Sequence, residues 1–119
     1  MVSLLWASLG PVVSVTADAG QADVTHLVLH HASGATSTVT VTLSTAEAEA
    51  YSELYLWGES GRSAAPAETD QPVRPLRVAL TELAGQASSG QRGHPCDVRF
   101  GRDIGRVLAT AQRQLDART

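Results

Sequence analysis

A run of alternating residues between Asp23 and Leu43 constrains the fold of this 119-residue chain more than any other feature. Two segments rich in β-branched residues flank a Ser33-Gly34 turn, a pattern that predicts an antiparallel pair of strands. From residue 36 to 43, every even position is threonine, and serine, valine and leucine take the odd positions. Because neighbouring side chains on a strand point to opposite faces, the predicted sheet has one apolar face and one threonine face.

Other strands precede and follow this pair, and helices close the chain. Alternation predicts further strands at residues 12–17 and 51–57, with a short edge strand at 62–65. Apolar spacing predicts a short helix at 1–9, a helix that opens at Pro75 and a last helix with Asp97 as its N-cap. Strands before helices, with no parallel crossover, predict an α+β fold. We expect a mainly antiparallel open sheet with the two C-terminal helices and the short N-terminal helix packed on one face.

Each C-terminal helix carries an apolar stripe that predicts its buried face. The stripe of the first helix consists of Leu76, Leu80, Leu83, Ala84 and Ala87. The stripe of the last helix consists of Phe100, Ile104, Val107, Leu108, Ala111 and Leu115. Gly101 and Gly105 in the last helix predict a close approach to the sheet or to a neighbouring helix.

Length and composition predict a single domain over residues 1–119. No apolar run has the length of a membrane span, and the first nine residues lack the basic start and the cleavage region of a signal peptide. The lone cysteine, Cys96, has no internal disulfide partner, which favours a reducing compartment. We therefore expect a cytoplasmic protein without a membrane partner.

All nine basic residues are arginine, a bias typical of a high-GC bacterial genome. Without lysine, the chain has no residue for Schiff-base chemistry and no phosphate-loop lysine. Its formal net charge is −3, and the arginines of the two C-terminal helices have no interleaved aromatic residues. This pattern argues against nucleic acid as a partner.

The residues that could carry catalysis or bind a metal do not form a constellation in the sequence. His26 and His30 lie four residues apart on one strand, a separation of about 13 Å at about 3.3 Å per residue, which is too long for one metal ion. Cys96 precedes Asp97, whose charge opposes a lowered thiol pKa, and a rigid proline tethers His94 beside it. We therefore assign no catalytic, cofactor-binding or metal-ligating residue in this chain.

Three of the five aromatic residues form a row on the predicted strand at 51–57. Tyr51, Tyr55 and Trp57 share one side of that strand, opposite the apolar side. Together with the threonine row Thr38, Thr40 and Thr42, they form a broad amphipathic patch of the kind found at protein interfaces. We expect a homodimer that forms through this sheet face.

Three segments of the sequence resemble a known family. They are residues 4–15, the hairpin at 23–43 and residues 53–62, and the closing segment 94–103 adds to the likeness. The chain resembles the C-terminal domain of the glucose–fructose oxidoreductase / inositol dehydrogenase (Gfo/Idh/MocA) family over nearly its whole length. The resemblance implies a parent enzyme whose N-terminal Rossmann domain binds NAD or NADP. The C-terminal domain then encloses a sugar or polyol substrate, and its sheet forms oligomers.

The chain departs from that family at the residues that carry the chemistry. The Rossmann domain is absent, and the catalytic lysine of the family has no counterpart. Ser3 takes the place of the catalytic aspartate, and the position of the catalytic histidine precedes Met1. We therefore expect that the chain transfers no hydride by itself and holds no cofactor. The resemblance places Trp6 near the substrate of the parent enzyme.

Two other functions are compatible with the sequence. The first is a free-standing dimeric α+β module that holds a small ligand between sheet and helices. Its pocket would be lined by Leu27, Leu29, Val39 and Val41. The second is an enzyme that uses His94, Cys96 or the strand histidines.

Overall fold

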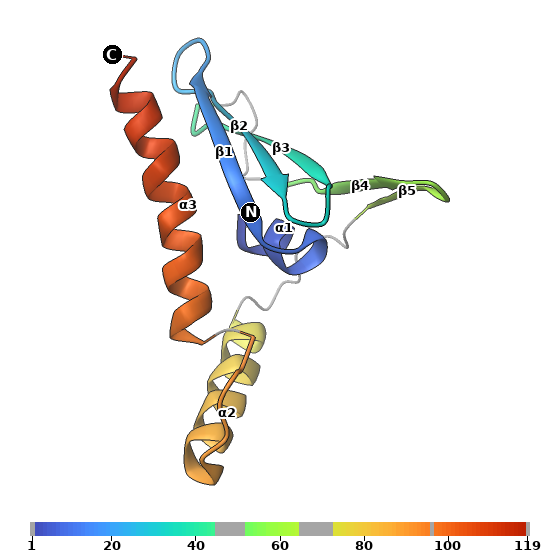
Figure 1. Ribbon diagram of the computed structural model, residues 1–119, viewed down its shortest axis with the longest axis vertical. Helices are drawn as coiled ribbons and strands as arrows, with labels where there is room; N and C mark the ends of the chain where they lie inside the picture. The colour runs from blue at the N-terminus through green and yellow to red at the C-terminus, as the bar shows by residue number, and fades with distance from the viewer. Residues whose placement is uncertain (1, 45–51, 65–72, 96, 119) are drawn as a thin grey trace. The chain divides into compact units, whose positions relative to one another are not determined.

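The computed structural model describes residues 2–44, 52–64, 73–95 and 97–118 (Figure 1). The chain divides into two compact units. The first unit comprises residues 1–45 and 95–119, and the second comprises residues 46–94. The fold is α+β with antiparallel strands, as the sequence predicts. Within the described residues, no helix has both the length and the apolar character needed to cross a membrane.

The first unit contains a three-stranded antiparallel sheet in the order β1-β2-β3. Its strands are β1 (Val12–Ala19), β2 (Thr25–His31) and β3 (Thr36–Val41). The register places Leu29 of β2 between Val15 of β1 and Ser37 of β3. A short helix, α1 (Val2–Leu9), precedes the sheet, and the long helix α3 (Val98–Asp116) packs along β1 (Figure 1).

The turn between β2 and β3 fixes the hydrogen-bond pattern of that pair. Gly34 adopts a φ of 90°, a left-handed conformation that glycine reaches without strain. The N–H of Gly34 donates to the carbonyl of His31 at 3.0 Å, and the N–H of His31 donates to the carbonyl of Ala35 at 2.9 Å. Since hydrogen-bonded and non-hydrogen-bonded pairs alternate, the odd-numbered residues of β3 direct their backbone groups toward β2.

The core of the first unit lies on one face of the sheet. Strand alternation buries Val15, Ala17, Leu27, Leu29 and Val39 on this face, as the sequence predicts. Val107 and Ala111 are the buried residues of α3, and Val2 and Leu5 are those of α1. Leu29 is fully buried, so it is the best-enclosed large side chain among the described residues.

Helix α3 begins as predicted, but its buried face is narrower than the predicted stripe. The side chain of Asp97 accepts a hydrogen bond from the N–H of Phe100 at 3.0 Å, which makes it the N-cap. Leu108 is exposed, so its place in the stripe is a wrong prediction. Nothing in the described structure lies within 4 Å of a Cβ placed at Gly101 or Gly105. The predicted close approach at these glycines is therefore not seen there.

One side chain of α3 completes the hydrogen bonding of β1. The Gln114 side-chain carbonyl accepts from the N–H of Ala17 at 2.7 Å, and its amide group donates to the carbonyl of Val15 at 2.8 Å. These are the two bonds that a neighbouring strand would make at this position. Just after the end of α3, Arg118 forms an ion pair with Asp18. The end of α3 is thus tied to the outer edge of β1.

The second unit contains a hairpin and a helix. Strands β4 (Tyr55–Gly58) and β5 (Gly61–Ala64) pair with each other as a separate two-stranded sheet. The predicted strand at 51–57 is thus shorter at its start, and the predicted edge strand does not extend the larger sheet. Helix α2 (Val73–Ser89) begins two residues before Pro75. The connections at 45–51 and 65–72 lie outside the described residues.

A carboxylate before β2 holds the chain segment that follows β3. Asp23 accepts hydrogen bonds from the hydroxyl of Thr42 at 2.6 Å, the N–H of Leu43 at 2.7 Å and the hydroxyl of Ser44 at 3.1 Å. The Thr42 hydroxyl, followed by the Leu43 N–H, lowers the pKa of Asp23 from its ordinary value of 3.8. The ionised carboxylate is therefore the form that the fold stabilises.

The hydrogen bonds to Asp23 predict that the segment after β3 opens more often in acid. A lowered folded-state pKa gives stability that is complete above the ordinary value and is lost as the pH falls through the lowered value. We expect the amides of Leu43 and Ser44 to exchange faster with solvent as the pH drops below 3.8, after correction for intrinsic rates. An Asp23→Asn variant, which cannot ionise, should show no such step. The same step in that variant would contradict the assignment.

Candidate interaction surface

The face of the three-stranded sheet opposite the buried core carries three rows of mostly polar side chains. Thr36, Thr38 and Thr40 of β3 are exposed on this face, and alternation places them opposite the buried Ser37 and Val39. The threonine face predicted from the sequence is therefore present. The neighbouring row on β2 consists of His26, Val28 and His30, and β1 contributes Ser14, Thr16 and Asp18.

Histidine and threonine side chains are joined across β2 and β3. Nδ1 of His26 is hydrogen-bonded to Oγ1 of Thr40 at 3.0 Å, and Nδ1 of His30 to Oγ1 of Thr36 at 3.4 Å. These residues form non-hydrogen-bonded backbone pairs, the positions where cross-strand side chains come closest. The two rows therefore present one ordered polar surface. Thr42, which the sequence assigns to the same row, instead donates its hydroxyl to Asp23.

The polar face does not gather the ligands of a metal site. His26 and His30 lie on this face at the ends of the β2 row, whereas His31 points to the opposite side. Among the described residues, no three side chains of histidine, cysteine, aspartate or glutamate come together as metal ligands.

His31 is a buried polar residue that connects three elements. It is only 3% exposed, and its Nδ1 lies 2.8 Å from the carbonyl oxygen of Gly10, which follows α1. Its Nε2 lies 2.9 Å from Oγ of Ser37 in β3. Because a carbonyl only accepts, Nδ1 donates to Gly10, and in the neutral imidazole this leaves Nε2 to accept from the serine hydroxyl. This role of His31 was not predicted from the sequence, although its odd position after Leu27 and Leu29 indicates an inward side chain.

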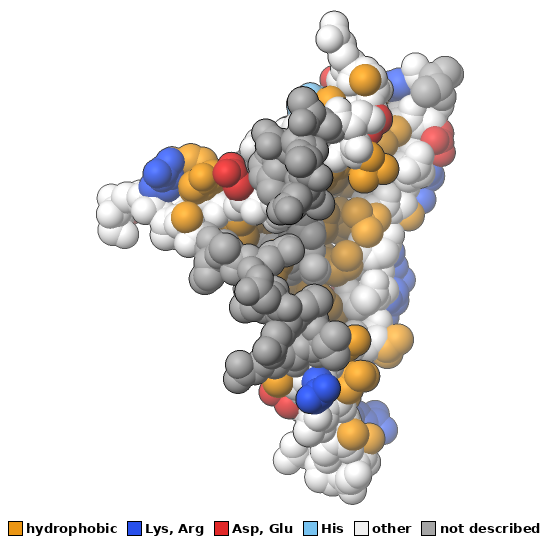
Figure 2. Space-filling view, turned by 180° about the vertical axis from the view of Figure 1, so that it is seen from behind, with side chains coloured by type: hydrophobic (Ala, Val, Ile, Leu, Met, Phe, Trp, Pro, Cys, Tyr) orange, Lys and Arg blue, Asp and Glu red, His pale blue; other side chains and the backbone are white. Residues whose placement is uncertain are grey.

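The β4–β5 hairpin presents two aromatic rings and an arginine on one face. The ring centroids of Tyr55 and Trp57 lie 5.9 Å apart, and the guanidinium of Arg62 lies 4.9 Å from the centroid of Tyr55. Trp57 is 74% exposed, and its cross-strand partner is Arg62. Figure 2 shows hydrophobic and basic side chains next to each other on this hairpin. Tyr51, the third member of the predicted row, lies outside the described residues.

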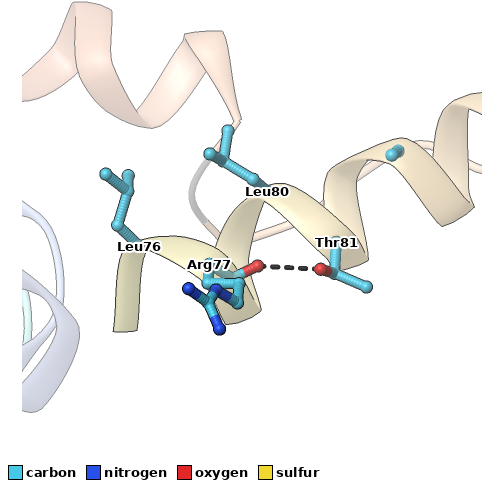
Figure 3. A pocket seen from close by; sticks show the side chains of 5 residues that line it. Leu76, Arg77, Leu80 and Thr81 are labelled. Carbon is cyan, nitrogen blue, oxygen red and sulfur yellow. Dashed lines mark hydrogen bonds between the residues drawn. The ribbon is translucent and has the colours of Figure 1, made fainter. Parts of the chain in front are cut away.

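Helix α2 has an open apolar depression on one side. It is lined by Leu76, Leu80 and Ala84, with Arg77 and Thr81 beside them (Figure 3). The hydroxyl of Thr81 donates to the carbonyl of Arg77 at 2.9 Å, so this polar group is used within the helix. The predicted apolar stripe lies on one side of the helix, but its predicted burial is wrong at Leu76 and Leu80, which are exposed.

The remaining candidate residues have structural partners or lie outside the described residues. Nε2 of the buried His94 is 2.6 Å from a carboxylate oxygen of Glu82 on α2. Cys96 lies outside the described residues. Trp6 packs edge-to-face against Phe100 of α3, with ring centroids 6.5 Å apart and an interplanar angle of 84°. Trp6 thus joins the two helices of the first unit.

Proteins of known family or structure offer no match to this chain. No protein-family model, no curated protein and no solved structure matches it.

Proposed function

We propose that this chain is a self-associating, non-catalytic α+β domain. It is the counterpart of the C-terminal domain of a Gfo/Idh/MocA oxidoreductase, and it forms a homodimer through the polar face of its three-stranded sheet. The observation that carries the proposal is the ordered row of threonines and histidines on a face that lies opposite the buried core.

The composition of this face favours contact with a second protein surface. Threonine offers a methyl group and a hydroxyl on a stiff side chain, so little rotamer freedom is lost when it is buried. The half-buried Val28 lies between the two histidines and gives the face an apolar centre within a polar surround. No lysine or glutamate, whose ordering is costly, lies on β2 or β3.

In the parent enzyme, the domain would cover a sugar or polyol while a Rossmann domain holds NAD or NADP. This chain contributes to that arrangement a wall and an oligomer contact, and the reacting groups lie elsewhere in the parent enzyme. Trp6 is the residue proposed to lie near the substrate. Its edge-to-face contact with Phe100 supports this role because the contact fixes the orientation of the indole.

A charge placed in the centre of the face should break the dimer. We expect Val28→Glu to halve the mass of the assembly in sedimentation velocity, since the new carboxylates would be buried opposite each other at the centre of the contact. Ala109→Glu, on the exposed side of α3, is the matched control and should leave the mass unchanged. A Tyr55→Glu, Trp57→Glu variant tests in the same measurement whether the hairpin belongs to the contact.

The outcome is unambiguous if the variants remain folded. Circular dichroism spectra that match those of the parent chain establish this. A Val28→Glu chain that keeps the parent mass would show that the face is not the interface. An unchanged mass for the hairpin variant alone would restrict the interface to the sheet.

A further inference from the structure

The two outer edges of the three-stranded sheet differ in whether their outward backbone groups are hydrogen-bonded. At β1, the Gln114 amide bonds the outward backbone groups of Val15 and Ala17, and α3 packs along the strand. At β3, no strand in the described part of the chain pairs with the outer side. Within the described residues, the sheet therefore has one closed edge and one open edge.

The backbone groups available at the open edge follow from the turn geometry. Odd-numbered residues of β3 bond to β2, as the His31–Ala35 pair establishes. The N–H and carbonyl groups of Thr36, Thr38 and Thr40 therefore point away from the sheet. They form a regular series of donors and acceptors, which is the template that an additional antiparallel strand requires.

The sequence of β3 lacks the residues that usually prevent an edge strand from pairing with another chain. Residues 36–41 contain no charged residue and no proline, and five of the six are β-branched. Val41, at the end of the strand, is 47% exposed although it continues the apolar row of the buried Val39. The edge therefore offers both hydrogen-bonding groups and an apolar side chain that remains to be covered.

From these features, we propose that the open edge of β3 pairs antiparallel with β3 of a second copy of this chain. The pairing joins two three-stranded sheets into one continuous six-stranded sheet. In the register centred on Thr40, each Val41 lies opposite Val39 of the second copy, so that the exposed apolar residue continues a buried row. Only outward-pointing residues then exchange backbone hydrogen bonds. A strand paired with its own copy satisfies both edges by the same bonds, as two-fold symmetry requires.

This edge contact is independent of the face contact proposed above. Val41 points to the buried side of the sheet and Val28 to the polar side. Val41→Lys therefore tests the edge contact, and Val28→Glu tests the face contact. A chain that makes both contacts forms a tetramer, and either variant alone then yields a dimer. Failure of one contact is therefore distinguishable from failure of the other.

Amide exchange and sedimentation together test the edge contact. We expect the amides of Thr38 and Thr40 to become protected as the protein concentration rises, by at least about tenfold in exchange rate. The Val39 amide, which bonds to β2 in every state, is the internal reference. A charge at an edge strand blocks pairing, so Val41→Lys should weaken this association at least about tenfold. Val13→Lys, at an exposed valine on β1, should leave the association unchanged.

Two results would overturn the proposal. One is fast exchange of the Thr38 and Thr40 amides at every concentration, because paired edges protect these groups. The other is an association constant of Val41→Lys equal to that of the parent chain. Spectra of both valine variants that match the parent spectrum show that the sheet itself is intact.

Discussion

Replacing Leu29 with alanine should lower the free energy of unfolding by about 2–5 kcal/mol. The side chain has 0% exposure and lies on the central strand, between β1 and β3. The substitution removes three heavy atoms from the centre of the core, and neighbours held by strand pairing on both sides cannot move in to fill the space. Urea denaturation followed by far-ultraviolet circular dichroism measures the change.

Leu43→Ala provides the matched control for that experiment. Leu43 is 99% exposed, so the same chemical change should alter the stability by less than about 0.5 kcal/mol. Equal effects of the two substitutions would contradict the placement of the core.

Replacing His31 with leucine should destabilise the first unit by about 2–4 kcal/mol, since it leaves two buried groups without their partner. The carbonyl of Gly10 loses a donor, and the hydroxyl of Ser37 loses an acceptor. A second substitution, Ser37→Ala, removes one of these unpaired groups. The double variant should therefore be more stable than the sum of the single effects predicts, by about 1 kcal/mol.

Gln112→Leu is the control for this series, because Gln112 is an exposed polar residue on α3 in the same unit. We expect a change within about 0.5 kcal/mol for this variant, measured by the same urea titration. Strictly additive effects of His31→Leu and Ser37→Ala would mean that the Nε2–Oγ contact contributes nothing to stability.

Local patterns predicted the parts of the fold that depend on local physics. The alternation at residues 36–43 assigned the faces of β3 because strand geometry alone sets that alternation. Asp97 was predicted as an N-cap because aspartate is favoured at that position, and its carboxylate accepts from the N–H three residues later. The threonine face, the main feature of the candidate surface, followed from the same alternation.

Such local patterns do not predict contacts between residues that are far apart in the sequence. Gln114 meets Ala17 across 97 positions, and no spacing rule connects a polar residue of a helix with the edge of a strand. Helical periodicity correctly grouped Leu76 with Leu80, but it does not say whether another element covers them, and both are exposed. Strand periodicity likewise predicted a strand at 51–57, whereas β4 covers only residues 55–58, the residues that pair with β5.

The bonds from Gln114 to Val15 and Ala17 have a consequence for the order of events during synthesis. Ala17 of β1 leaves the ribosome 97 positions before the glutamine that bonds the outer backbone groups of this strand. A nascent chain therefore carries two unsatisfied strand edges until Gln114 has been synthesised, and a product truncated before Gln114 retains both. Synthesis through Gln114 is thus a condition for a sheet with one hydrogen-bonded outer edge.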